Sequence, residues 1–139
     1  MSRALPSRSG GQIMIGLARV AAVLVGLFGL ALGMWFFVKT PDAAAAFFVQ
    51  PQGAAGEATL RADMSSFFLI GAAWAFYAAW SKRGAALLVP GALYMVAIAG
   101  RAVNLAVNGL FTGAILPMIV EAMLIVLCVF GYKALRPQA

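Results

Sequence analysis

Four long apolar segments constrain the fold of this chain more than any other feature of its sequence. They extend over about residues 13–38, 60–80, 85–108 and 113–132. A helix needs about 20 predominantly apolar residues to cross the hydrocarbon core of a bilayer. We therefore predict an all-α fold: a single domain formed by an integral membrane four-helix bundle, with short hairpin loops and one longer outer loop between its first two helices.

The composition supports this class. Of the 139 residues, 64% are hydrophobic and 10% are charged, whereas a soluble domain has about 45–50% apolar and about 25% charged residues. The net charge of +6 would suit a nucleic-acid-binding protein, but the basic residues are scattered along apolar segments. Positive charge in a membrane protein is usually a topology signal. We therefore expect the lipid bilayer, and no nucleic acid, as a partner.

The first apolar segment has two interpretations. The residues after it, "DAAAAF" at 42–47, are small enough to offer a signal-peptide cleavage site. However, the segment is longer than the apolar core of a signal peptide, which has roughly 7–15 residues. Trp35, Phe36 and Phe37 at its far end also have the character of an interfacial aromatic anchor. We therefore predict a retained helix.

The basic residues predict the orientation of the four spans. Four spans place both termini on one side of the membrane, and that side would hold seven basic residues against three on the other. Because cytoplasmic loops are enriched in lysine and arginine, we predict that both termini, a tail at residues 1–12 and the Ser81–Gly84 hairpin are cytoplasmic. The seven residues are Arg3, Arg8, Arg19, Lys82, Arg83, Lys133 and Arg136, and the three are Lys39, Arg61 and Arg101.

The outer connection, residues 39–59, is the longest loop. Its first part, "TPDAAAAFFV", predicts a short interfacial helix. Thr40 suits the N-cap, Pro41 the first helical position and Asp42 the positive end of the helix dipole. The apolar residues 47–49 would let this helix lie on the membrane surface. The segment that follows, "QPQGAAGEA", has the composition of a flexible link.

Gly29 and Gly33 have a spacing that lets two helices approach closely. The spacing has two interpretations: packing inside the bundle, or a homodimer formed through the first helix. The sequence leaves both open.

Polar and aromatic side chains follow one face of the third span. A helix turns by about 100° per residue, which places Tyr94, Arg101, Asn104 and Asn108 on one narrow face. Asn108 and Gly109 form a helix-stop signal. Arg101 therefore lies about 10 Å inside the end of this helix.

The second and fourth spans carry corresponding faces. In the fourth span Glu121 shares a face with Cys128, and in the second span Asp63 shares a face with Trp74 and Tyr77. The simplest arrangement turns these polar faces of the second, third and fourth spans towards the interior of the bundle. We therefore predict that Asp63 and Glu121 meet the arginine of the third span in the outer half of the bundle.

Three roles are open for this predicted cluster. An unpaired charge at the centre of a membrane helix costs about 2.5–3.5 kcal/mol, and pairing Arg101 with Glu121 would remove much of that cost. Asp63 would leave one negative charge over, which favours a protonated carboxyl, a bound cation or a ligand amine. The cluster is then a structural ion pair, a site for a ligand, lipid or ion, or an acid–base site. In the third case Glu121 or Asp63 transfers protons and Arg101 stabilises charge.

The segment "GRAVNLAVNGLFTGAILPMIVEAMLIVLCVFGYKALR" contains three short motifs in a fixed order. They are a glycine–arginine pair (Gly100, Arg101), a polar turn (Asn108, Gly109) and a glutamate within the last helix (Glu121). In this order they resemble the C-terminal half of the bacterial membrane family called domain of unknown function 4345.

The resemblance extends over about residues 57–136. The segment "RADMSSFFLIGAAWAFYAAWSKRGAALLVPGALY" is similar to the family's middle helices, with Arg61 and Asp63 at a charged helix start. The resemblance implies a four-helix protein of the bacterial inner membrane and implies no particular activity. A looser similarity to DoxX-like four-helix membrane proteins points to the same architecture.

These observations predict a small non-catalytic protein of the bacterial inner membrane, either an accessory subunit or a structural or binding module. One alternative is a carrier or receptor for a small apolar, amine or lipid ligand, and another is an intramembrane acid–base enzyme of the isomerase or cyclase type. The chain has no histidine and one cysteine, so no metal or cofactor is expected. A larger membrane complex or a second copy of the chain is a further expected partner. The predicted site residues are Asp63, Arg101, Asn104, Asn108, Glu121, Trp74, Tyr77 and Tyr94.

Overall fold

A computed structural model describes residues 8–135 and contains helices but no strands in that range. Four stretches, Gly10–Val38, Gly53–Ser81, Gly84–Asn108 and Ile115–Ala134, are long and apolar enough to cross a membrane. The predicted all-α class with four long apolar helices is therefore confirmed. In chain order the elements are α1 (Arg8–Val38), α2 (Thr40–Ala46), α3 (Gly53–Ser81), the 3-10 helix η1 (Gly84–Leu87), α4 (Leu88–Asn108) and α5 (Ile115–Ala134).

The largest difference from the predicted boundaries is at the start of the second long helix. α3 begins at Gly53, so most of the segment expected to be a flexible link is helical. That expectation was wrong because its alanines favour a helix and Glu57 forms an ion pair of 2.6 Å with Arg61 one turn later. α1 begins at Arg8, inside the predicted tail, and residues 1–7 of that tail lie outside the described residues.

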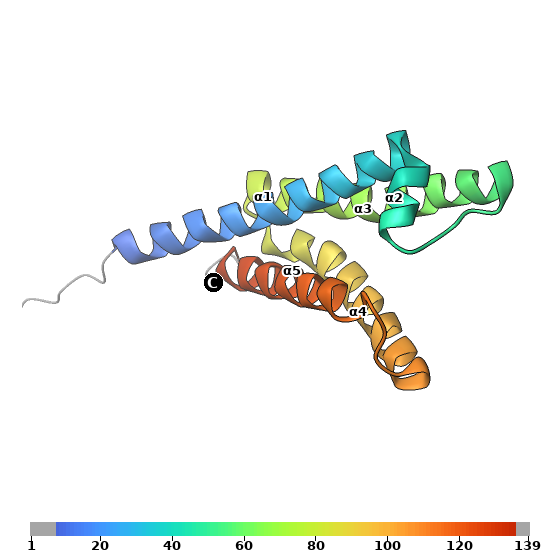
Figure 1. Cartoon of the computed structure of the whole chain (residues 1–139). Coiled ribbons are helices and arrows are strands. Elements are labelled where there is room, and N and C mark those ends of the chain that lie inside the picture. Colours follow the sequence, from blue (N-terminus) through green and yellow to red (C-terminus); the bar gives the residue numbers. More distant parts are fainter. Residues whose placement is uncertain (1–7, 136–139) are drawn as a thin grey trace, which may run out of the picture.

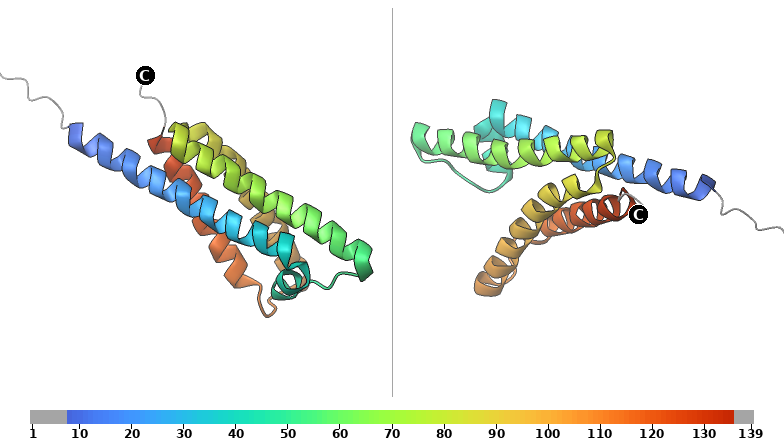
Figure 2. Two further views of the ribbon diagram at one scale, coloured as in Figure 1. Left: turned by 90° about the horizontal axis from the view of Figure 1, so that it is seen from above. Right: turned by 180° about the vertical axis from the view of Figure 1, so that it is seen from behind.

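The long helices form two layers (Figure 1). α1 and α3 lie antiparallel in one layer, and α4 and α5 lie antiparallel in the other, with α5 against α1 and α4 against α3 (Figure 2). The layers are close at the end that carries the turn from α3 to η1, and they diverge towards the opposite end. The molecule therefore has a narrow end at this turn and a wide end near α2.

The narrow end is held by backbone geometry and one side chain. α3 ends at Ser81, and Lys82 takes a left-handed conformation with a φ of 56°, which reverses the chain as the predicted hairpin requires. Arg19 of α1 donates from Nε to the carbonyl oxygen of Ala79 at 2.8 Å. This bond joins α1 to the last turn of α3.

Glycines of α1 bring α1 and α3 into close contact. A Cβ added at Gly29 would lie 2.8 Å from the carbonyl oxygen of Phe68, and one at Gly33 would lie 2.6 Å from Cγ of Leu69. The spacing therefore serves helix packing within the chain, which was one of the two interpretations. The other, a homodimer through Gly29 and Gly33, is not favoured, because α3 occupies that face of α1.

The ends of α4 and α5 agree with the predicted signals. α4 ends at Asn108, and Gly109 takes a φ of 72°. α5 begins at Ile115, so Pro117 lies in its first turn, where the missing N–H of proline costs no helical hydrogen bond. These ends place the predicted arginine and glutamate at similar distances from the loop that joins the two helices.

Candidate functional site

A cavity of about 690 Å³ lies between the two layers at the wide end of the molecule. We call it the interlayer cleft. Pockets that bind small molecules have volumes of roughly 300–1,000 Å³ and are mostly apolar, so the cleft has the size and character of a binding site. Its aromatic lining consists of Phe28, Phe47, Phe48, Phe67, Phe68, Tyr94 and Phe111, and its polar lining of Arg101, Asn104, Thr112 and Glu121.

Tyr94 is the aromatic residue at the centre of this lining. Only 3% of it is exposed, and its ring meets those of Phe28 and Phe67 edge to face, with centroids 6.5 Å and 6.1 Å away. Such edge-to-face pairs add about 0.5–1.5 kcal/mol each beyond the burial of their area. The rings of α1, α3 and α4 therefore form a fixed wall, and the prediction that Tyr94 faces inward is confirmed.

The predicted ion pair between α4 and α5 forms. Nε of Arg101 donates to Oε1 of Glu121 at 2.8 Å. Arg101 lies seven residues before the end of α4, and Glu121 lies six residues after the start of α5, which places both groups about 10 Å from their helix ends. The hairpin therefore brings the two charges to the same depth.

The two partners differ in their surroundings. Glu121 is 8% exposed, and its second oxygen, Oε2, is buried without a hydrogen-bond partner among the described residues. The side chain of Arg101 is 37% exposed, and it lines the interlayer cleft. The glutamate therefore depends on the arginine for neutralisation, while the arginine keeps N–H groups for other partners.

A second, smaller hollow of about 290 Å³ adjoins the cleft. We call it the side pocket. It shares Ala97, Arg101, Asn104 and Phe111 with the interlayer cleft, so the arginine borders both spaces. Gly100 and Ala114 complete its lining.

The two predicted asparagines interact with each other. Nδ2 of Asn108 donates to Oδ1 of Asn104 at 2.7 Å. Asn104 lines both hollows, whereas Asn108 lines neither of them. Of the two, only Asn104 therefore belongs to the site, and Asn108 fixes the orientation of its amide.

Three residues predicted to join the cluster lie elsewhere. Asp63 is exposed and lines neither hollow, and Trp74 and Tyr77 are 42% and 44% exposed and pack edge to face against each other. The prediction was wrong because α3 turns a different face inward. Its small residues, such as Ala72 and Ala75, pack into the molecule and are buried, and small residues let helix backbones approach closely.

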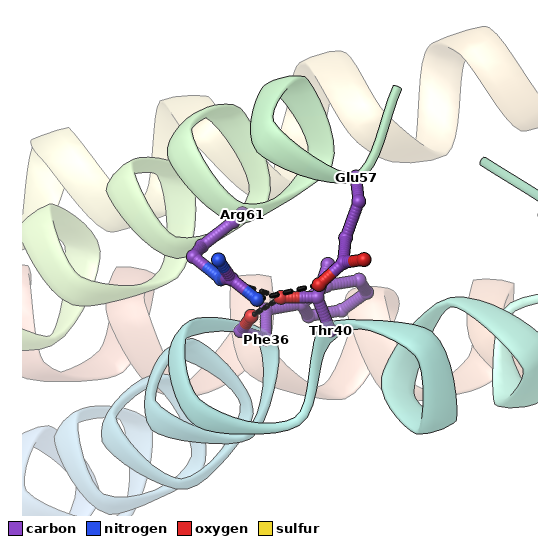
Figure 3. Close-up of polar contacts among 4 residues, drawn as sticks. All are labelled: Phe36, Thr40, Glu57 and Arg61. Carbon is purple, nitrogen blue, oxygen red and sulfur yellow. Dashed lines mark hydrogen bonds and ion pairs between the residues drawn. The ribbon is translucent and has the colours of Figure 1, made fainter. Parts of the chain in front are cut away.

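A polar relay that the sequence analysis missed fixes α2 to α1 and α3 (Figure 3). Nε of Arg61 donates to the hydroxyl of Thr40 at 2.9 Å, and this hydroxyl donates to the carbonyl oxygen of Phe36 at 2.6 Å. Arg61 also pairs with Glu57. Thr40 is therefore not the N-cap, which was the predicted role. Lys39 precedes the helix instead.

α2 packs against the rest of the protein. Ala43 and Ala44 are buried, and the ring of Phe47 packs against those of Phe36 and Phe68, with centroids 5.1 Å and 6.3 Å away. The expected short helix therefore forms, and its apolar side is directed at α1 and α3. Ala46 of α2 and the two residues that follow it, Phe47 and Phe48, line the interlayer cleft at its wide end.

α2 ends in a turn that glycine usually makes. The N–H groups of Phe48 and Val49 donate to the carbonyl oxygens of Ala45 and Ala44, and Phe48 takes a φ of 58°. This is a Schellman motif, in which the left-handed residue is most often glycine. A Cβ at Gly113 would lie 2.7 Å from the ring of Phe48. The ring therefore bridges from α2 to the loop between α4 and α5, which explains why a phenylalanine is useful at a strained position.

Thr40→Val is expected to weaken the attachment of α2 by about 1–2 kcal/mol, because the valine removes both hydrogen bonds of the relay and leaves Nε of Arg61 without its acceptor. Amide hydrogen exchange over residues 43–49 should become faster by roughly tenfold. Thr59→Val is the matched control, since Thr59 also donates to a carbonyl one turn earlier but is exposed, and its bond lies within α3. Equal exchange in both variants would contradict a role of the relay in holding α2.

Within residues 8–135 no group of three or more His, Cys, Asp or Glu side chains is placed to hold a metal ion. Comparison with known proteins finds no match to a family model, a curated protein or a solved structure. The resemblance of residues 57–136 to the family of domain of unknown function 4345 therefore stays a prediction.

Proposed function

We propose that this chain is a small, non-catalytic membrane protein that binds an apolar or lipidic molecule in the interlayer cleft. The cleft itself carries the proposal. It is of ligand size, it is lined mainly by apolar side chains, seven of which are aromatic, and Ala46 of α2 lines it together with Phe47 and Phe48. Bundle proteins commonly bind ligands between their helices.

The proposed place of this protein is the bacterial inner membrane, with both termini in the cytoplasm. The four apolar helices support a membrane location. The narrow end carries Lys82 and Arg83, so the positive-inside rule directs the narrow end to the cytoplasm and the wide end outward. The interlayer cleft would then lie in the outer half of the membrane, where a ligand enters from the outer leaflet.

The geometry favours binding over the other candidate functions. An acid–base site was motivated by two neighbouring carboxyl groups, but Asp63 lies outside the cleft and Glu121 is paired with Arg101. An accessory subunit of a larger complex remains compatible with a ligand site, because the lipid-facing surfaces of α1 and α4 carry exposed apolar side chains such as Leu24 and Val103. An accessory subunit with this cleft would also bind a ligand.

Ala97→Leu is expected to weaken binding of a pyrene-labelled alkane by about tenfold, a loss of about 1.4 kcal/mol, because the larger side chain fills the boundary between cleft and side pocket. Binding to the detergent-purified full chain is followed by energy transfer from tryptophan to pyrene. Ala99→Leu is the matched control on an exposed face of the same helix, and it should bind the probe as the wild type does. Equal binding by both variants would contradict a ligand site in the cleft.

A further inference from the structure

The side pocket indicates which chemical class the cleft accepts. This inference rests on the proposed function, since a head group is held there only if the ligand's apolar body occupies the interlayer cleft. The two hollows share Arg101 and Asn104. A molecule whose chain lies among the aromatic rings therefore presents one end to these two side chains.

The accessible polar groups left over at this junction are hydrogen-bond donors, because the one acceptor without a partner among the described residues, Oε2 of Glu121, is itself buried. A guanidinium has five N–H groups and no acceptor, and only the Nε–H of Arg101 has a partner within the described part of the chain, namely Glu121. The side-chain oxygen of Asn104 accepts from Asn108, so the NH2 group of Asn104 is left to donate. A ligand group that complements these donors is a hydrogen-bond acceptor.

The charges of the described residues favour a neutral acceptor. Arg101 and Glu121 neutralise each other at 2.8 Å. Asp63, which would have added a negative charge and attracted an amine, is outside both hollows. A ligand ammonium would face donors and a cation, and a ligand carboxylate would add an uncompensated charge beside the carboxylate of Glu121.

We infer that the interlayer cleft binds a neutral amphiphile whose head is a carbonyl acceptor, such as an ester or a ketone, held by Arg101 and Asn104 at the side pocket. The aliphatic body lies against the aromatic wall around Tyr94. Hydrogen bonds from a charged donor are stronger than neutral ones, so the arginine supplies most of the preference for an acceptor head.

The test is competition against the pyrene-labelled alkane by four molecules with similar chains: hexadecane, methyl palmitate, palmitate and hexadecylamine. Methyl palmitate should displace the probe at roughly tenfold lower concentration than hexadecane, because one hydrogen bond to a charged group has about that effect. The amine should be no better than the alkane. Strongest competition by palmitate or by the amine would overturn the assignment of a neutral acceptor.

Variants separate the head-group preference from binding itself. Asn104→Leu should reduce the advantage of the ester over the alkane several-fold, and the double variant Arg101→Gln/Glu121→Gln should reduce it to about twofold or less. Both should still bind the alkane probe. Asp63→Asn is the control and should keep the wild-type preference. If the double variant does not fold, Asn104→Leu alone still tests the inference.

The outcomes distinguish this inference from the function on which it rests. Equal competition by ester and alkane, with the probe bound normally, would overturn the head-group assignment and leave the proposed function intact. Failure of the wild type to bind the probe at all would overturn the proposed function. An ester preference that persists in both Asn104→Leu and the double variant would show that other residues hold the head group.

Discussion

Arg101→Leu is expected to lower the free energy of unfolding by about 2–4 kcal/mol. Removing one partner of a buried ion pair typically costs about 3–5 kcal/mol, and the expected loss is smaller here because the side chain of Arg101 is 37% exposed. Oε2 of Glu121 already lacks a partner, so without the arginine both oxygens of a nearly buried carboxylate would be unsatisfied. Denaturant titration of the purified protein in mild detergent measures the loss.

The reverse substitution tests the asymmetry of the pair. Glu121→Leu should cost less, about 1–2 kcal/mol, because the long stem of Arg101 lets its charge reach the lipid headgroups. The double variant Arg101→Leu/Glu121→Leu should lie within about 1 kcal/mol of the wild type, as replacement of both partners by apolar groups is often neutral. Losses that simply add in the double variant would show that the two residues are not coupled.

The second large effect is expected in the seam between α1 and α3. Gly29→Ala should destabilise the protein by about 2–3 kcal/mol, because its Cβ would lie 2.8 Å from the backbone oxygen of Phe68 and 3.2 Å from Cβ of Ala72. A backbone oxygen yields only if the helices separate. The same unfolding titration measures this loss.

Gly16→Ala provides the matched control in the same helix. Nothing lies within 4 Å of a Cβ at Gly16, so the alanine should be neutral or stabilise the helix by up to about 1 kcal/mol. Neither variant should change the oligomeric state, since the Gly29 face is covered by α3. A Gly29→Ala protein of unchanged stability that dissociates into smaller species would restore the homodimer interpretation.

The sequence predicted the helices and the Arg101–Glu121 pair for identifiable physical reasons. Apolar length alone determines which segments are long enough to cross a membrane. The depth of each charge follows from the helix end at Asn108 and Gly109 and from the helix start near Pro117. Because the loop between the two helices is short, the helices must lie next to each other. Depth and proximity were therefore both readable from the sequence.

The position of Asp63 was not readable in the same way. Helical periodicity gives the angle between residues of one helix, but not which face turns inward. In α3 the packed face was determined by its contact with the glycines of α1, an interaction between segments about 40 residues apart. The small residues Gly71, Ala75 and Ala79, one every fourth position, are all buried and were a sequence signal for the inward side of α3, where Gly71 lies against Pro90 and Leu93 of α4.

The relay through Thr40 and the divergence of the layers also could not be predicted from the sequence. Thr40 is a plausible N-cap by its position, and only the approach of Arg61 from α3 shows that its hydroxyl is used between helices. The divergence of the layers depends on how the two helix hairpins pack against each other, and no local sequence pattern predicts that packing. The cleft, which results from this divergence, therefore emerged only with the three-dimensional arrangement.

In the proposed membrane location, the unequal lengths of the helices have a consequence for the fit to the bilayer. The apolar stretches of α1 and α3 each have 29 residues, and that of α5 has 20, which correspond to lengths of about 43 Å and about 30 Å. The hydrocarbon core of a bilayer is about 30 Å thick, so in a membrane the longer helices would have to tilt or project beyond it. We therefore expect the thickness of the bilayer to influence the angle between the layers. A thicker membrane would draw them towards parallel and narrow the cleft, and a thinner one would spread them and widen it.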